Sequence, residues 1–190
     1  MNDSTTLVQQ QNYRIYLISN IIISLVGGVF GPFYILFVQQ KGGGVENFGL
    51  ALGFLLLTQS IVSYFAGKYS DISGRKPLLI LQGYLFSIVI LSYLFIVQIW
   101  QLYLLQIING LLGGIEVAVG SSFLADITET KNRGRMIGKY QAIVGITTAI
   151  AMMLSGYFVA LTGIKTIFII MAIANVFSAT LYIFIKEKRN

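Results

Sequence analysis

The chain has 190 residues, of which 56% are hydrophobic and 11% are charged. A soluble domain of this size carries about a quarter charged residues, so the composition indicates a protein that lies largely within a membrane. The chain has no cysteine and no histidine, which excludes disulfides, thiol nucleophiles, histidine bases and the usual zinc ligands. We therefore expect no metal, no cofactor and no catalytic residues, and we do not expect an enzyme.

Apolar runs of about twenty residues recur along the chain and predict transmembrane helices. We expect six helices, in chain order at 15–38, 48–66, 78–98, 100–125, 137–161 and 164–185. Residues 1–14 and 187–190 are then cytoplasmic tails that flank a helical domain at 15–186. The predicted fold class is an all-α membrane protein.

The lysines and arginines fix the expected orientation. With six spans, eleven of the 13 fall on one side of the membrane, and only Lys41 and Lys165 fall on the other. Because basic loops stay in the cytoplasm, both termini are predicted to be cytoplasmic, in a multi-pass protein of the plasma membrane. The same distribution explains the net charge of +6 without a nucleic-acid partner, and the expected partner is the lipid bilayer.

Polar and small residues share one face of helix 1 and one face of helix 4. They are Asn20, Ser24, Gly27 and Gly31 in the first, and Gln106, Asn109, Gly113, Glu116 and Gly120 in the second. Lipid favours neither amides nor glycines, so these faces should contact protein or water. Close helix packing and a lined cavity both explain them, and the candidate cavity residues are Asn20, Gln106, Asn109 and Glu116. Similar stripes of small residues in helices 2 and 5 favour close packing.

Glu116 is the one acid deep within a predicted span. An ionised carboxylate there costs about 2.5–3.5 kcal/mol on the insertion scale unless it is paired or hydrated. No lysine or arginine lies deep enough in a span to pair with it. Glu116 could carry a proton, bind substrate, or be a neutral structural acid bonded to amides such as Asn20 or Asn109.

An internal repeat relates the two halves of the chain. A shift of 86 residues lays Asn20 on Gln106 and the sequence Leu-Val-Gly-Gly at 25–28 on Leu-Leu-Gly-Gly at 111–114. Helix 1 thus echoes helix 4, although the two helices enter the membrane from opposite sides. The pattern predicts two inverted three-helix units, as in one half of a secondary transporter.

The stretch from Gly67 to Pro77 predicts a tight, charged loop between helices 2 and 3. The spacing of its glycines and charges resembles the cytoplasmic loop between helices 2 and 3 of major facilitator superfamily transporters. The matching residues are Gly67, Asp71, Gly74, Arg75 and Lys76, and Ile72 stands where the family usually has a basic residue. The resemblance covers about the whole chain, which corresponds to half of a usual twelve-helix transporter.

The resemblance implies a six-helix half-transporter that moves a small-molecule substrate by alternating access. Asp126 and Arg133 resemble the end of helix 4 in that family, and Asp126 is an expected partner for Arg75. The implied cytoplasmic gate contains Gly67, Asp71, Gly74, Arg75, Lys76, Asp126 and Arg133. Two departures from the family argue against proton-driven antiport: Gln106 replaces a frequent arginine, and helix 5 lacks the proline of the antiporter signature.

A single half cannot enclose a substrate path, so the chain needs a partner. A homodimer with twofold symmetry would copy the arrangement of the two halves of the family. Two alternatives remain open: a transport-inactive subunit or scaffold that pairs with another half, and the first half of a longer transporter.

Overall fold

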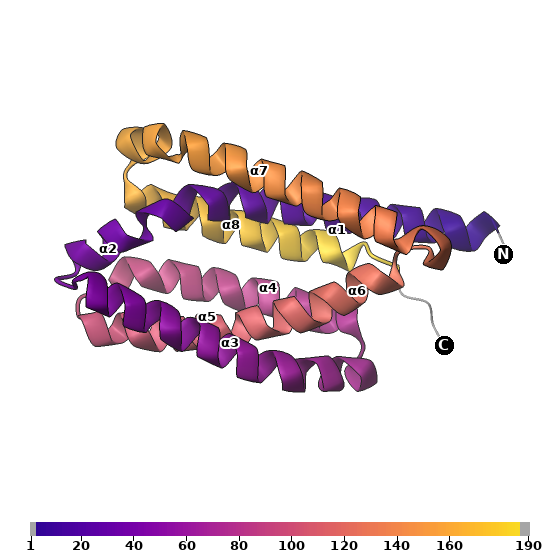
Figure 1. The fold of residues 1–190 in the computed structure, drawn as a ribbon, viewed down its shortest axis with the longest axis horizontal. Helices are drawn as coiled ribbons and strands as arrows, with labels where there is room; N and C mark the ends of the chain where they lie inside the picture. The colour runs from indigo at the N-terminus through magenta and orange to yellow at the C-terminus, as the bar shows by residue number, and fades with distance from the viewer. Residues whose placement is uncertain (1–2, 187–190) are drawn as a thin grey trace.

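The structure, a computed structural model, describes residues 3–186. The first span consists of α1 (Asp3–Phe30), a 3₁₀ turn (Gly31–Phe33) and α2 (Tyr34–Gln40). The second span is α3 (Val45–Ser73). The third span is α4 (Arg75–Ser92), followed by a 3₁₀ turn (Tyr93–Phe95). The fourth span consists of α5 (Ile99–Ile115), a π-helical turn (Glu116–Gly120) and α6 (Ser121–Asp126). The fifth span is a 3₁₀ turn (Thr130–Asn132) followed by α7 (Arg133–Thr162). The sixth span is α8 (Ile164–Ile183). Within residues 3–186, six helices are long and apolar enough to cross a membrane, which confirms the predicted fold class (Figure 1).

Several helices begin earlier or end later than the apolar runs that predicted them, whereas α8 and the third span end earlier. The first begins at Asp3 rather than at residue 15, and α3 continues to Ser73. An apolar run marks the part of a helix that lipid surrounds, whereas the helix itself ends only where its backbone hydrogen bonds end. The predicted tail at 187–190, with Lys188 and Arg189, lies outside the described residues.

The prediction of a loop from Gly67 to Pro77 is wrong. The structure keeps this stretch helical except at Gly74, where φ is +84°. Such a φ is readily adopted only by glycine, so one residue suffices to reverse the chain between α3 and α4. Gly67 and Asp71 consequently lie within α3, and Arg75 and Lys76 open α4.

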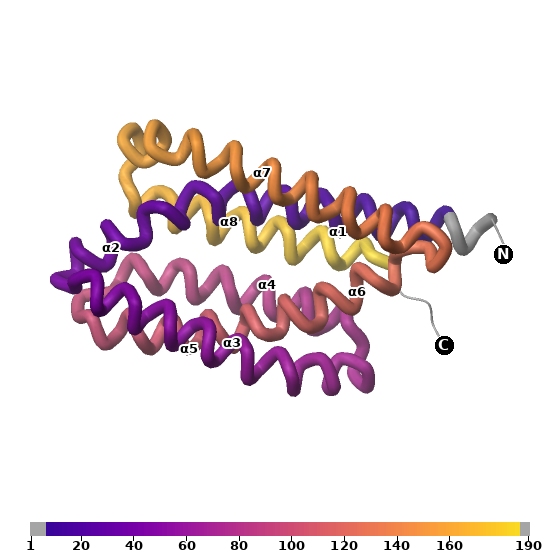
Figure 2. The backbone as a smooth tube through the Cα atoms, viewed as in Figure 1, coloured from indigo at the N-terminus to yellow at the C-terminus, as the bar shows by residue number. Residues whose placement is uncertain are grey.

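The six spans form two layers. One layer contains α1, α7 and α8, and the other contains α3, α4 and α5 (Figures 1 and 2). Within the layers α1 packs along α7 and α8, and α3 packs along α5, while α4 and α8 pack together across the boundary. The α3–α4 turn, the α6–α7 connection and the end of α8 lie at one end of the bundle. The basic residues gather there, and Lys41 and Lys165 lie near connections at the other end.

Close contacts at two glycines confirm the inverted repeat. A Cβ on Gly28 would lie 2.8 Å from the carbonyl oxygen of Thr148, and a Cβ on Gly114 would lie 2.8 Å from the Cβ of Val62. The 86-residue shift that carries Gly28 to Gly114 also carries Val62 to Thr148. Thus the packing of α1 on α7 repeats the packing of α5 on α3.

Helices 1 and 4 are interrupted at equivalent positions. The first span breaks at Gly31–Phe33, between α1 and α2, where Pro32 cannot donate a helical hydrogen bond. The fourth span forms a π-helical turn at Glu116–Gly120, between α5 and α6. Shifted by 86, residues 31–33 become 117–119, which lie inside the π turn. The short helices α2 and α6 follow the two breaks, so each unit ends its first helix with a redirected segment.

The close approach at Gly114 gives a stability prediction. Gly114→Ala should destabilise the protein by about 1–3 kcal/mol, the usual cost of overpacking, because the new Cβ would meet backbone atoms of α3. Gly138→Ala is the matched control, because no atom lies within 4 Å of the Cβ position there. Thermal unfolding in detergent should show a lower midpoint for Gly114→Ala alone, and equal midpoints would contradict the packing.

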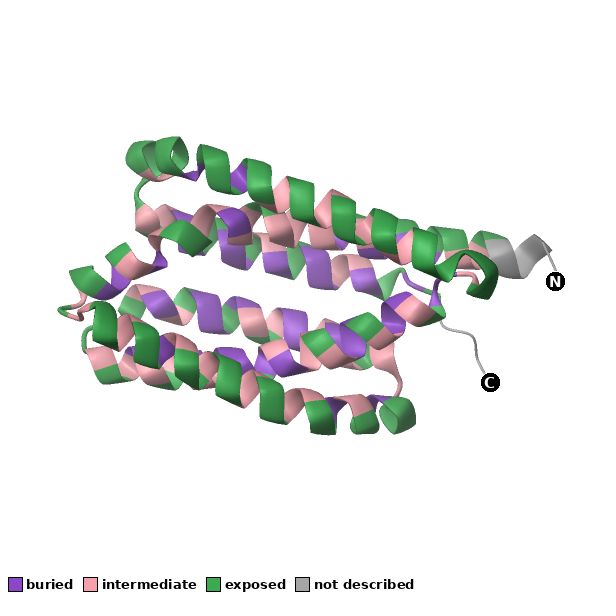
Figure 3. Ribbon diagram, in the orientation of Figure 1, coloured by how far each residue is buried: buried purple, intermediate pink, exposed green. Residues whose placement is uncertain are grey.

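The outer faces of α3 and α7 are largely uncovered (Figure 3). In the most apolar stretch of each helix, 6% of α3 and 11% of α7 residues are buried, against 50% in α8. These two helices therefore present the main apolar surfaces that the chain itself leaves open.

Candidate functional site

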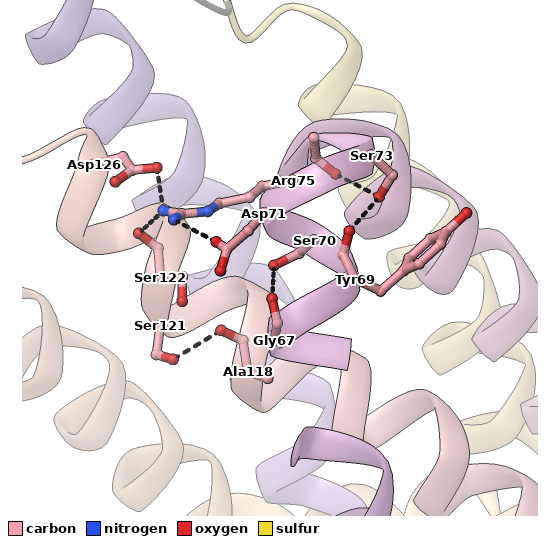
Figure 4. A network of polar contacts seen from close by, with 11 residues as sticks. Gly67, Tyr69, Ser70, Asp71, Ser73, Arg75, Ala118, Ser121, Ser122 and Asp126 are labelled. Atoms are coloured by element: carbon pink, nitrogen blue, oxygen red, sulfur yellow. Dashed lines mark hydrogen bonds and ion pairs between the residues drawn. The ribbon is translucent and has the colours of Figure 1, made fainter. Parts of the chain in front are cut away.

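Arg75 organises a polar cluster at the end of the bundle where basic residues gather. Its Nη1 donates to the carbonyl oxygen of Ser122 at 2.5 Å and to the Oδ2 of Asp126, and its Nη2 donates to the Oδ1 of Asp71 at 3.4 Å (Figure 4). The turn at Gly74 puts Arg75 at the start of α4, from which it reaches both α3 and α6. We call these residues, Asp71, Arg75, Ser122 and Asp126, the cytoplasmic cluster, because the basic residues predict that this end of the bundle is cytoplasmic. The structure thus contains the expected pair of Arg75 with Asp126.

The members of this cluster differ in exposure. The Arg75 side chain is 22% exposed, whereas those of Asp126 and Asp71 are 57% and 68% exposed. Exposed ion pairs stabilise a fold by only about 0.2–1 kcal/mol. The cluster therefore contributes more to the relative position of α3, α4 and α6 than to overall stability, and it leaves the Asp71 carboxylate open to a further contact.

The other predicted gate residues lie around this cluster. A Cβ on Gly67 would be 3.8 Å from the Cβ of Ala118, so α3 lies beside the π turn there and a small side chain would fit between them. Lys76 points elsewhere, because its Nζ donates to the carbonyl oxygens of Ile183 and Ile185 at 2.7 Å each, beside the end of α8. Arg133 is exposed at the start of α7 and takes no part in the ion pairs of Arg75.

Gln106 and Asn109 form a closed hydrogen-bonded group with two tyrosines. The Nε2 of Gln106 donates to the Tyr34 hydroxyl, and the Tyr93 hydroxyl donates to the Oε1 of Gln106 at 3.2 Å. The Nδ2 of Asn109 donates to the Tyr93 hydroxyl. All four residues are buried, and the two amides join α5 to α2 and to the 3₁₀ turn after α4, while the Oδ1 of Asn109 is buried without a hydrogen bond to any residue from 3 to 186.

Asn20 makes the equivalent contact in the other unit. Its Nδ2 donates to the Tyr182 hydroxyl at 3.3 Å, which joins α1 to α8. Gln106 of α5 bonds Tyr93 in the 3₁₀ turn after α4 and so joins the fourth span to the third. The inverted repeat relates this pair of spans to the first and the sixth, which Asn20 joins. The amides therefore have a shared structural role that the sequence did not distinguish from cavity lining.

Glu116 lies where the two layers meet. It opens the π turn, and its Oε1 would be 3.2 Å from a Cβ on Gly120, while the Tyr16 hydroxyl would be 2.8 Å from the same point. The missing side chain of Gly120 thus leaves room for both groups. Tyr16, Tyr140 and Tyr182, from α1, α7 and α8, are all within electrostatic reach of Glu116.

The three tyrosines form a stack that we call the tyrosine cluster. The ring centroid of Tyr16 lies 5.5 Å from that of Tyr140 and 5.8 Å from that of Tyr182, with interplanar angles of 22° and 21°. This geometry is that of offset aromatic stacking. Glu116 belongs to the opposite layer, so its side chain faces the stacked rings across the boundary between the two layers.

The Glu116 carboxylate has no hydrogen bond or ion pair with any residue from 3 to 186, and it is partly exposed. The amides suggested as its partners are engaged elsewhere, because Asn20 bonds Tyr182 and Asn109 bonds Tyr93. Glu116 lies about 15 Å from Asp126 along the helix axis, which is half the thickness of a bilayer core. Substrate sites of transporters lie near the bilayer midplane, and π turns are frequent at functional sites.

The sequence analysis missed two features of these sites. It did not identify the carbonyl group of Ser122, which any residue type could supply. It also missed Tyr16, Tyr140 and Tyr182, although a hydroxyl within an apolar run is a usable signal. Their assembly depends on three helices far apart in the sequence, so only the tertiary structure reveals the cluster.

Comparison with known proteins identifies the family. Residues 16–190 match the family model described as Major Facilitator Superfamily. The chain is 28% identical over 137 residues to the uncharacterized MFS-type transporter YitZ of Bacillus subtilis, covering 72% of this chain and 84% of that protein. It is 27% identical over 188 residues to the multi-drug resistance efflux pump PmrA of Streptococcus pneumoniae, covering 96% of this chain and 47% of the pump.

A third relative has a narrower match. The class H tetracycline resistance protein of Pasteurella multocida is 36% identical over 115 residues, which cover 58% of this chain and 27% of that protein. The chain thus spans about half the length of the pump PmrA and most of the length of YitZ. Because the family model covers nearly all of its residues, this chain belongs to the major facilitator superfamily.

Proposed function

We propose that this chain moves a small solute across the plasma membrane by alternating access, as one six-helix half of a transporter. Membership of the family indicates a multi-pass membrane transporter rather than an enzyme. The names of relatives, a multi-drug resistance efflux pump and a tetracycline resistance protein, favour a drug-like solute that leaves the cell. The observation that carries the proposal is the cytoplasmic cluster, in which Arg75 joins three helices at one end of the bundle.

In this proposal each protomer rocks as a unit. The contacts of α4 with α8 hold the two layers of a protomer together, and those of α1 with α7 and of α3 with α5 hold each layer. Arg75 fixes the α3–α4 turn to α6, and the exposed Asp71 carboxylate then meets the partner half when the cytoplasmic side closes. When the cytoplasmic side opens, that contact breaks, while the contacts of Arg75 within its own protomer persist.

The partner in this proposal is a second copy of the chain. The uncovered faces of α3 and α7 carry glycines at 53 and 145 whose Cβ positions have no atom within 4 Å. Small residues allow close approach of helices in lipid, so these faces suit a helical partner better than lipid alone. Cross-linking in membranes tests this, and a uniformly monomeric protein that still transports would contradict it.

A second six-helix half is the alternative partner. This chain covers 47% of the pump PmrA, so another half could occupy the position that the remainder of the pump occupies there. The chain would then be a subunit that does not transport alone. Reconstitution of the single chain separates the two cases.

The proposed orientation gives a labelling prediction. Val45→Cys and Asn132→Cys each introduce one exposed thiol into a chain that has no other cysteine. Because they lie at opposite ends of the bundle, with the basic end cytoplasmic, an impermeant maleimide should label only Val45→Cys in intact cells. After permeabilisation Asn132→Cys should label as well, and labelling of both variants in intact cells would contradict the orientation.

Transport is tested with the purified chain in liposomes, using tetracycline and ethidium as probes. Saturable counterflow of either probe, above that of protein-free liposomes, is the expected result. Lys68→Ala, an exposed site on α3 near the cytoplasmic cluster, is the matched control and should keep full activity. Permeation equal to that of protein-free liposomes for both probes would reject transport by the single chain.

A further inference from the structure

A groove runs along α1 between α7 and α8, and we call it the α1 groove. It contains a cavity of about 250 Å³ to which all three helices contribute side chains. The residues that line this cavity are apolar, and among them are Leu25, Val29, Ile150, Leu154, Ile167 and Ile170. An apolar cavity on the membrane-facing surface of a span suits an apolar occupant, such as the acyl chain of a lipid.

The floor of the α1 groove continues toward the end of the bundle where basic residues gather. Arg14, Ile18, Leu25 and Val29 recur at spacings of four, seven and four residues, so they share one face of α1. Arg14 and Ile18 are exposed on that face. At a rise of 1.5 Å per residue, Arg14 lies about 16 Å from Leu25 along the helix. This distance is close to half the thickness of a bilayer core, about 15 Å.

Lys139 stands beside Arg14 at the same end of the groove. It lies on one face of α7 with Ile150, since eleven residues turn a helix by three full turns and about 20°. The Tyr13 hydroxyl donates to the carbonyl oxygen of Met136 at 3.0 Å, which aligns α1 with α7 at this level. Lys139 and Arg14 are exposed, and neither makes a hydrogen bond or an ion pair with a residue from 3 to 186.

Three acids at this end of the bundle are engaged elsewhere. Asp71 and Asp126 pair with Arg75. The carboxylate of Glu129 accepts a hydrogen bond from Asn132 at 3.4 Å. The head of the α1 groove therefore carries two positive charges without an acidic partner, and basic residues at a membrane surface attract anionic headgroups. A positive head above an apolar cavity is complementary to an anionic amphiphile.

We infer that the α1 groove binds an anionic phospholipid. Its phosphate contacts Arg14 and Lys139, and one of its acyl chains lies along α1 and ends in the cavity. The lipid comes from the leaflet at the basic end of the bundle, which is the cytoplasmic leaflet in the proposed orientation. Gly145, on the proposed partner face, lies about 140° around α7 from Ile150. A bound lipid thus leaves that face open, and the inference does not depend on transport.

Native mass spectrometry of the purified chain tests the headgroup, with dioleoyl phosphatidylglycerol and dioleoyl phosphatidylcholine as competing probes. The parent protein should retain the anionic lipid about ten-fold more strongly than the zwitterionic lipid, because each nearby cation favours the anion. Arg14→Gln combined with Lys139→Gln should lose this preference. Lys68→Gln combined with Lys131→Gln removes two exposed charges at the same end and should keep it. No preference in the parent, or an equal loss in both double variants, would overturn the inference.

A second pair of variants tests the cavity. Leu25→Trp should fill the groove and weaken retention of dioleoyl phosphatidylglycerol several-fold. Ile88→Trp, at an exposed position on α4, is the matched control and should retain the lipid as the parent does. Monodisperse elution and unchanged helical circular dichroism would show that each variant is folded. Parent-like retention in Leu25→Trp would contradict an acyl chain in the cavity.

Two soluble probes separate a lipid from a free anion. Dihexanoyl phosphatidylglycerol has the headgroup without long chains, and inorganic phosphate has the charge alone. If the acyl chain and the phosphate both contribute, neither probe at equal concentration should displace dioleoyl phosphatidylglycerol. Displacement by either probe would mean that the basic residues bind an anion without the cavity, and it would overturn the inference.

Discussion

Replacing Arg75 with alanine is expected to reduce solute transport by about ten-fold or more, which corresponds to about 1.4 kcal/mol in the barrier. Arg75 makes two ion pairs and one hydrogen bond to a carbonyl group, and these join α4 to α3 and α6. Without them, the position of Asp71 at the closing surface is no longer fixed. The initial rate of probe counterflow in proteoliposomes is the measurement.

The same experiment separates gating from folding. Because the carboxylates are more than half exposed, the Arg75→Ala protein should still insert and purify. Arg75→Lys should restore little activity, since an ammonium group cannot reproduce the forked contacts of a guanidinium. Asp71→Asn should also slow transport at unchanged stability. Parent-like transport rates in both Arg75→Ala and Asp71→Asn would mean that the cytoplasmic cluster only sets the orientation of the chain in the membrane and does not gate transport.

Glu116→Gln is expected to abolish gradient-driven accumulation of solute while exchange of solute across the membrane survives. This result requires that the carboxylate carries a proton during net transport, because exchange involves no net proton movement. The structure gives the side chain no hydrogen-bond or ion-pair partner among residues 3–186 and puts it at the layer boundary. Glutamine preserves the shape and most hydrogen-bonding capacity.

Other outcomes of Glu116→Gln would assign a different role. A parallel loss of accumulation and exchange would mean that the carboxylate contacts the substrate. Retention of both activities, with at most a modest loss of stability, would mean a neutral structural acid. Accumulation driven by an imposed proton gradient, measured beside exchange at equal pH on both sides, distinguishes the three.

The apolar runs predicted the six spans because hydropathy acts locally, whereas helix ends depend on backbone hydrogen bonds. The chain reversal between α3 and α4 was therefore placed in a loop of eleven residues, although Gly74 alone makes it. The motif did predict the pair of Arg75 with Asp126. It could not predict that Lys76 contacts the end of α8, since that contact depends on how two distant helices pack.

The roles of the polar residues within the spans were harder to predict from the sequence. Asn20, Gln106 and Asn109 share helix faces with Glu116, and periodicity assigned all four to one candidate cavity. Their hydrogen bonds divide them, because the amides bond tyrosines of neighbouring helices and Glu116 does not. A pattern along one helix reports which face is polar. It does not report which neighbour meets that face.

Reciprocal movement of the two ends of a homodimer is tested most directly by electron paramagnetic resonance distances between identical spin labels. The labels are attached through Val45→Cys or, in a separate protein, Asn132→Cys, at opposite ends of the bundle. Each labelled dimer should show two distance populations. Adding Arg75→Ala should lengthen the distance at residue 132 and shorten it at residue 45. The absence of a dipolar signal between protomers, or distributions that Arg75→Ala leaves unchanged, would contradict alternating access by a homodimer.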